Sequence, residues 1–337
     1  MILKILKNNI NKIVFAIILF AIFVYQIQDG YRFFTFSITG QSIVARTQDF
    51  LTLVLSIIVE AFPFIILGVV FSVIVGVFVK EEWILKRIPK NRILSHVIIS
   101  FVGIFMPVCE CGNIPVARRL VLKGFSVSQS ITFLLAAPIL NPITYLVTAE
   151  AFSYDKSVVV IRMVAGFVIA NFVGILISFK KDQNDLLTPE FYQQVCEIHE
   201  HDSKSKFRQA LEIFEEEFIQ VIKVLCIGAI LAALSQTLIP REFILSLGQN
   251  PFLSIIAMII LAFVVSICSN VDAFFALSYA NSFTIGSILS FLVFGPMIDI
   301  KILAMMKTTY KTKVLVMVLI LVTLMSILLG LLVNYFK

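Results

Sequence analysis

Charged residues are scarce in this chain. Asp, Glu, Lys and Arg make up 14% of its 337 residues, whereas 59% are hydrophobic. Soluble globular domains carry about 25% charged residues, so this composition excludes that class. Cysteine is also rare, with five residues, and an odd number lying partly in apolar runs argues against a disulfide framework. The chain has no ATP-binding loop and no Ser/His/Asp arrangement, so we expect a protein that is not an enzyme and has no cofactor. Any pumping must then be secondary or depend on a separate partner.

Long apolar runs are what the chain has instead. An apolar run of about 20 residues spans a bilayer as a helix, so the sequence predicts an all-α polytopic membrane protein. The net charge of +6 comes from Lys and Arg in short loops. That is the orientation signal of bacterial inner-membrane proteins, with lipid rather than nucleic acid as the partner. The runs cover about 13–29, 51–79, 93–108, 126–149, 157–179, 218–239, 251–267, 284–305 and 313–335.

The sequence contains an internal repeat with polar groups between apolar runs. Cys111-x-Asn113 aligns with Cys268-x-Asn270. Transporters use such duplicated polar segments to hold a solute at bilayer depth. The alignment extends upstream, where Gly68 matches Gly228 and Trp83-Ile84-Leu85 matches Phe243-Ile244-Leu245, and downstream, where Phe133, Leu134 and Pro138 match Phe291, Leu292 and Pro296.

Two topologies compete for the first polar segment. If 93–118 crosses the membrane, three basic residues and the polar segment 180–217 emerge outside. If 93–108 enters halfway and the chain turns at Cys109–Pro115, all of them return to the cytoplasm, as the positive-inside rule requires. The ten residues from Ile114 to Lys123 span about 15 Å of helix, or half a bilayer. The three basic residues that the two topologies place on opposite sides are Arg118, Arg119 and Lys123.

The re-entrant topology predicts an inverted repeat of three transmembrane helices plus one hairpin per half. An extra N-terminal helix, interpreted as a retained signal anchor, precedes it. The alternative is about nine crossings with parallel halves. The expected divisions are 1–49 for the anchor helix and external loop, 50–180 for the first repeat, 181–217 for a polar cytoplasmic linker and 218–337 for the second repeat.

Proline interrupts one apolar run in each half. Pro138-Ile-Leu-Asn-Pro142 breaks the first and Gly295-Pro-Met-Ile-Asp299 breaks the second. Proline removes a backbone donor, so each run predicts a broken helix at mid-depth. The alternative is that these prolines only kink packed helices.

Thiols and carboxylates mark the candidate site. Cys109, Glu110 and Cys111 form a C-E-C turn closed by Gly112, and thiolates prefer soft ions such as Cu(I), Zn(II) and trivalent arsenic. Cys268 supplies a third thiol from the second hairpin. The alternative is that these cysteines are small apolar packing residues.

Acidic and amide side chains complete the candidate set. Glu110, Asp272 and Asp299 lie at the predicted tips and breaks, where a buried acid serves as a ligand or a proton carrier. The substrate-binding candidates Asn113, Asn141 and Asn270 can coordinate through oxygen or cap half-helices. The spacing of Cys196, His199 and His201 predicts an accessory metal site. The alternative is that these residues belong to a solvated polar linker.

The stretch Pro107-Val-Cys-Glu-Cys-Gly-Asn-Ile-Pro115, with Leu134-Leu-Ala-Ala-Pro138-Ile-Leu-Asn-Pro142, resembles the predicted-permease family of ArsP-like organoarsenical exporters and YraQ/YcgR-type permeases. The resemblance runs from about residue 45 to the end. It implies an inner-membrane permease for arsenicals, copper or zinc, sometimes working with a smaller membrane partner protein. Its motif cysteines correspond to Cys109 and Cys111.

The combined interpretation is secondary efflux of a soft metal or metalloid species, such as zinc, copper or an arsenical. One alternative is a membrane thiol oxidoreductase that uses Cys109 and Cys111 as a redox pair. Another is a non-transporting membrane subunit of an envelope complex.

Overall fold

The computed structural model describes residues 43–78, 89, 91–105, 108–153, 155–180, 182–197, 206–238, 250–280 and 282–336. The chain divides into two compact units, Met1–Thr47 and Gln48–Lys337, and everything below concerns the second. The expected anchor helix at 13–29, the repeat positions at 83–85 and 243–245, and His199 with His201 lie outside the described residues.

The second unit is a membrane-type helical bundle. Within the described residues, all of its regular elements are helical, and five spans are long and apolar enough to cross a bilayer. Large apolar side chains such as Leu51, Val164 and Leu324 are exposed on them. Such side chains suit lipid rather than water, which confirms the polytopic membrane class. The five spans are Gln48–Phe78, Lys156–Ser178, Ala210–Gln236, Ile285–Met306 and Thr312–Phe336.

The order of helices repeats along the chain. Each series begins with a long helix, continues through two short helices and an interrupted pair, and ends with a long apolar helix. The first series is α2 (Ile43–Phe78), α4 (Arg92–Val102) with η1 (Gly103–Phe105), α5 (Glu110–Leu122), α6 (Val127–Ala136), α7 (Pro142–Ala151) and α8 (Lys156–Ser178); the second is α10 (Lys206–Leu238), α12 (Pro251–Val265), α13 (Asp272–Leu277), α14 (Ile285–Met297), α15 (Ile300–Met306) and α16 (Thr312–Phe336).

Both predicted helix breaks are confirmed. α6 ends at Ala136 and α7 begins at Pro142, where the Asn141 side chain accepts a 2.9 Å hydrogen bond from the Ile143 amide. α14 ends at Met297, and the Asp299 side chain starts α15 by accepting from the Ile302 amide at 2.5 Å. An Asn or Asp cap starts the second helix of each broken pair, α7 and α15. Proline at the first helical position is a further start signal for α7.

The predicted turn at Cys109–Pro115 is wrong in position. α5 is already helical from Glu110, so Glu110–Pro115 belong to a helix instead of a turn. Gly112 lies inside this helix. Its position requires glycine because a Cβ there would stand 2.4 Å from the Phe64 carbonyl oxygen of α2. The glycine therefore allows two helices to pack closely instead of allowing a turn.

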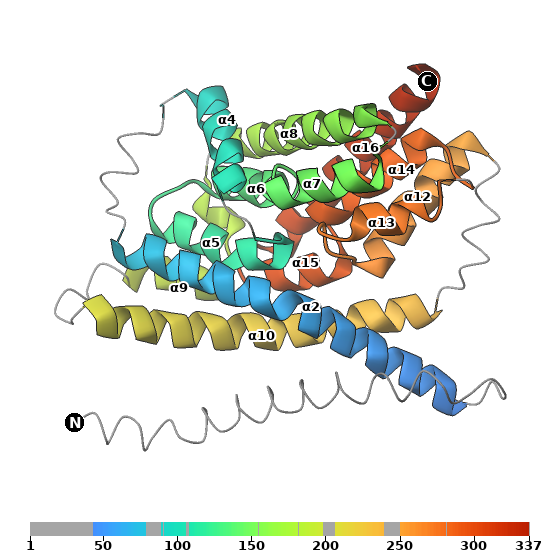
Figure 1. Cartoon of the computed structure of the whole chain (residues 1–337). Coiled ribbons are helices and arrows are strands. Elements are labelled where there is room, and N and C mark those ends of the chain that lie inside the picture. The colour runs from blue at the N-terminus through green and yellow to red at the C-terminus, as the bar shows by residue number, and fades with distance from the viewer. Residues whose placement is uncertain are drawn as a thin grey trace. The chain divides into compact units, whose positions relative to one another are not determined.

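The short helices of one half pack against those of the other. α7 contacts α13, and α15 contacts both α5 and α10. Figure 1 shows these short helices between α2 and α10 on one side and α8 and α16 on the other. The start of α5 and the loop between α12 and α13 also meet inside the bundle, where Glu110 contacts Cys268 and Ser269.

The segment between the two series is also folded in part. It contains η2 (Asn184–Leu186) and α9 (Pro189–Glu197). Leu187 forms a β-bridge with Tyr310, and the Thr188 amide donates to the Thr309 carbonyl at 3.0 Å. These bonds hold the segment against the loop between α15 and α16.

Candidate functional site

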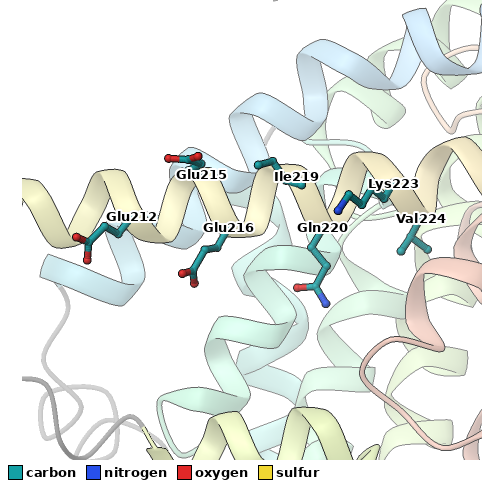
Figure 2. Close-up of a pocket in the computed structure, with 7 residues that line it drawn as sticks. All are labelled: Glu212, Glu215, Glu216, Ile219, Gln220, Lys223 and Val224. Carbon is teal, nitrogen blue, oxygen red and sulfur yellow. The ribbon is translucent and has the colours of Figure 1, made fainter. Parts of the chain in front are cut away.

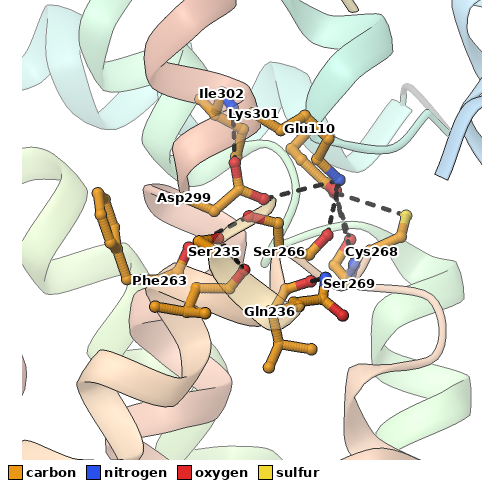
Figure 3. A network of polar contacts seen from close by, with 12 residues as sticks. Glu110, Ser235, Gln236, Phe263, Ser266, Cys268, Ser269, Asp299, Lys301 and Ile302 are labelled. Atoms are coloured by element: carbon orange, nitrogen blue, oxygen red, sulfur yellow. Dashed lines mark hydrogen bonds and ion pairs between the residues drawn. The ribbon is translucent and has the colours of Figure 1, made fainter. Parts of the chain in front are cut away.

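Glu110 lies at the centre of a buried polar cluster. It is the first residue of α5, and its carboxylate faces the loop after α12. Its Oε2 accepts a hydrogen bond from the Ser269 hydroxyl at 3.2 Å and from the Cys268 thiol at 3.6 Å. Figure 3 shows these groups converging from separate elements. A carboxylate from the first half is therefore bound by the second half.

Lys301 is the cation of this cluster. Its ammonium lies 3.1 Å from Glu110 Oε1 and donates to the Ser266 carbonyl at 3.2 Å. The residue is 3% exposed, and a buried lysine persists only when its charge is paired and hydrogen-bonded. Lys301 was not among the site residues predicted from the sequence. The available signal was a lysine inside the apolar run 284–305, two residues after Asp299.

Ser266 presents its carbonyl to Lys301 from an unusual backbone conformation. It ends α12 with φ 52° and ψ 43°, the left-handed region that helix C-termini use. A residue other than glycine there costs about 1–3 kcal/mol. The bond from Lys301 is one of the contacts that offset this cost.

Two thiols join the carboxylate. The ligand atoms of Cys109, Glu110 and Cys268 all lie within 4.8 Å of one another, and all three residues are buried. Cys111 is also buried, and its thiol interacts with that of Cys109, but it is not part of this group of three. Two sulfurs and one carboxylate oxygen form a donor set suited to a soft ion.

Two asparagines lie at equivalent positions after the repeated cysteines. Asn113 is fully buried in α5, and neither of its amide atoms bonds to any residue that the structure describes. The same is true of the amide of Asn270, which is partly exposed. Asn141 differs, because its nitrogen donates to the Val108 carbonyl at 3.0 Å while its oxygen caps α7. Among the described residues, the amide donors and acceptors of Asn113 and Asn270 thus have no partner.

Asp272 is paired with an arginine from the other half. Arg162 of α8 donates to its Oδ2 at 2.5 Å and to the Thr148 hydroxyl at 2.7 Å. Arg162 is fully buried in the run 157–179, and the sequence analysis did not identify it. The two halves therefore exchange ion pairs, since Glu110 of the first binds Lys301 of the second and Asp272 of the second binds Arg162 of the first.

Asp299 completes the Lys301 environment. Its Oδ1 caps α15, and its Oδ2 lies 3.6 Å from the Lys301 ammonium. That separation is an ion pair but longer than an ordinary hydrogen bond.

A second ionic cluster lies along α5, away from these thiols. Arg119 forms an ion pair with Glu217 of α10, which also accepts from the Ser72 hydroxyl of α2 at 2.5 Å. Arg118 lies over the Phe191 ring of α9 at 5.0 Å. These contacts join three helices and the segment between the repeats.

The surface of α10 carries a groove of about 540 Å³, shown in Figure 2. Its lining belongs to that one helix and does not include the Glu110 cluster, so the groove is separate from the candidate site. The Cys196 side chain and both histidines of the accessory metal prediction are not described, and that prediction stays a prediction. The lining residues are Glu212, Glu215, Glu216, Ile219, Gln220, Lys223 and Val224.

A family model described as a predicted permease, ArsP_1, matches residues 46–335. The chain belongs to this permease family. It is 40% identical over 259 residues to UPF0718 protein YcgR of Bacillus subtilis, covering 77% of this chain and 88% of YcgR. It is 34% identical over 287 residues to a putative two-component membrane permease complex subunit of Streptococcus mutans, covering 84% of this chain and 94% of that protein.

UPF0718 protein YraQ of Escherichia coli is 23% identical over 113 residues, which is 34% of this chain and 32% of YraQ. No solved structure matches the chain. The resemblance expected from residues Pro107–Pro115 is confirmed by these matches. With its membrane-length helices, this member of the permease family is a multi-pass cell membrane protein.

Proposed function

We propose that this permease is a secondary exporter of a soft metal or metalloid species, such as zinc, copper or an arsenical. The observation that carries the proposal is the buried convergence of Cys109 and Glu110 at the start of α5 with Cys268 from the loop between α12 and α13. A packing role for cysteine does not require two thiols beside a carboxylate in an apolar bundle. Soft ions prefer thiolate over oxygen ligands, which gives this site its selectivity.

The transport cycle in this proposal uses the repeat. The two halves form an inverted pair, with hairpin tips and broken helices meeting halfway through the lipid. Support comes from the repeated element order and from the exchange of ion pairs between halves. Movement of one half against the other exposes the site alternately to each side of the membrane.

Carboxylates at the site balance charge or carry protons in this scheme. Glu110 is the ligand, and Asp272 and Asp299 are the further coupling candidates. Each has a basic partner, so protonation of a carboxylate is linked to breaking an ion pair between helices. The free amides of Asn113 and Asn270 bind oxygen or hydroxyl groups of the substrate.

A second membrane subunit completes the proposal. The relative in Streptococcus mutans is named as a subunit of a two-component complex, and this chain covers nearly all of it. We therefore expect a second subunit, which the family resemblance suggests is a smaller membrane protein.

The test is metal tolerance in a bacterial host that lacks its own exporters. Wild-type protein raises tolerance to at least one of zinc, copper and arsenite, and the double variant Cys109→Ser/Cys268→Ser abolishes the gain at equal membrane abundance. Cys226→Ser is the matched control, because Cys226 is a free, half-buried cysteine of α10 outside the cluster. Undiminished tolerance in the double variant, or none from the wild type produced together with its membrane partner, refutes the proposal.

A further inference from the structure

Lys301 occupies the place that a bound cation needs. Its ammonium lies 3.1 Å from Glu110, the carboxylate of the three-residue donor set. Two positive charges a few ångströms apart repel strongly in a poorly screened interior. An ammonium also has no lone pair to offer a metal. A metal ion on Oε2 of Glu110 and the Lys301 ammonium on Oε1 therefore weaken each other's binding.

Asp299 offers the ammonium a second resting place. Its Oδ1 is fixed by the Ile302 amide, while its Oδ2 has no hydrogen-bond partner among the described residues. The Oδ2 atom stands 3.6 Å from the Lys301 ammonium, so a small side-chain movement makes a full hydrogen bond. Figure 3 shows Lys301 between these two carboxylates.

The backbone of Lys301 is fixed by helix packing, while its side chain can reach either Glu110 or Asp299. A Cβ added to Gly228 of α10 would stand 3.2 Å from the Lys301 Cα, so the two helices are in close contact there. A four-carbon side chain with rotatable bonds can move its charge without moving the helix. In its present position the ammonium also donates to the Ser266 carbonyl at 3.2 Å.

We propose that Lys301 is a tethered counter-ion that moves from Glu110 to Asp299 when a cationic substrate binds. The inference rests on the proposed function and assigns a specific role in it to Lys301. In the empty site the ammonium neutralises Glu110, and in the loaded site it neutralises Asp299. The Lys301 ammonium keeps its proton throughout, whereas the Cys109 and Cys268 thiols release theirs when they bind the ion as thiolates. Lys301 thus competes with the substrate for Glu110, which lowers affinity and promotes release.

The test is binding of Cd²⁺ to the purified full-length protein in detergent, followed by the ultraviolet sulfur-to-cadmium band. Lys301→Gln removes the competitor, so cadmium binds about tenfold tighter or more, as expected for a charged hydrogen bond of about 1.5–3 kcal/mol. The double variant Lys301→Gln/Asp299→Asn keeps the net charge of the site. It still binds more tightly than the wild type if Lys301 is a competitor, whereas a purely electrostatic effect leaves affinity unchanged.

The matched control is Arg119→Gln/Glu217→Gln, which removes another ion pair outside the site and leaves cadmium affinity within about twofold of wild type. Wild-type affinity in the charge-conserving double variant overturns the counter-ion role. Loss of the band in Cys109→Ser/Cys268→Ser shows that the thiols bind cadmium. This result tests the soft-ion site independently of the counter-ion role of Lys301, so either proposal can fail without the other. Absence of cadmium binding in every variant overturns both.

Discussion

Replacing Gly68 by alanine tests the close packing on which the site is built. A Cβ there would lie 2.0 Å from the Gly112 carbonyl oxygen, and the next nearest atoms also belong to the Gly112 backbone. Real Cβ atoms essentially never come closer than 3.0 Å, so α2 and α5 must separate by about 1 Å. Overpacking of this kind costs about 1–3 kcal/mol. A backbone neighbour cannot rotate away, so we expect the upper part of that range.

The assay is thermal unfolding of the purified protein in detergent, with Gly295→Ala as the matched control. The nearest atom to a Cβ at Gly295 is Ala262 Cβ at 3.6 Å, an ordinary contact. Alanine in place of a helical glycine gains about 0.5–1 kcal/mol. Gly295→Ala should therefore unfold at or above the wild-type temperature and Gly68→Ala below it. Equal unfolding temperatures for the two variants would refute the packing argument.

Three further outcomes are expected. Asp272→Asn leaves Arg162 buried without its counter-charge and lowers the free energy of unfolding by about 3–5 kcal/mol. In unfolding measurements, the double variant Asp272→Asn/Arg162→Gln loses less stability than the sum of the two single variants. Additive losses would contradict a coupled pair. Lys180→Cys should react with an impermeant maleimide in inverted vesicles but not in intact cells if the segment after α8 is cytoplasmic, and labelling of intact cells would contradict this topology. Ser72→Ala removes a hydrogen bond to the Glu217 carboxylate of α10 and lowers the free energy of unfolding by about 1.5–3 kcal/mol. Ser326→Ala lowers it by less, because the Ser326 hydroxyl has no partner among the described residues. Equal losses in the two variants would contradict a stabilising role of the Ser72 hydrogen bond.

Local chemistry is what made the fold readable from the sequence. Proline and a capping side chain within five residues were enough to predict the breaks at Pro138–Pro142 and Gly295–Asp299. The apolar runs predicted the membrane class because a spanning segment needs no distant partner to be recognised. The depth of the breaks and the inversion of the halves stay predictions.

Long-range contacts are what the sequence did not reveal. Gly112 suggested a turn, but its size is required by the Phe64 carbonyl of another helix. Lys301 and Arg162 were missed because each is stabilised in the interior by an acid more than a hundred positions away in the chain. Cys268 was inferred from the repeat alone, and its thiol lies beside Glu110.

The most direct test of the central claim is cross-linking of Cys109 to Cys268 in a protein that keeps only these two cysteines. The chain is cut at a protease site inserted in 198–205, so a link joins two fragments. With a methylene-bridged bis-methanethiosulfonate, the account predicts joined fragments in membranes, and protection from the link by excess Cd²⁺. Fragments that stay apart, or a link that forms equally well with Cd²⁺ present, would contradict a soft-ion site shared by the two halves.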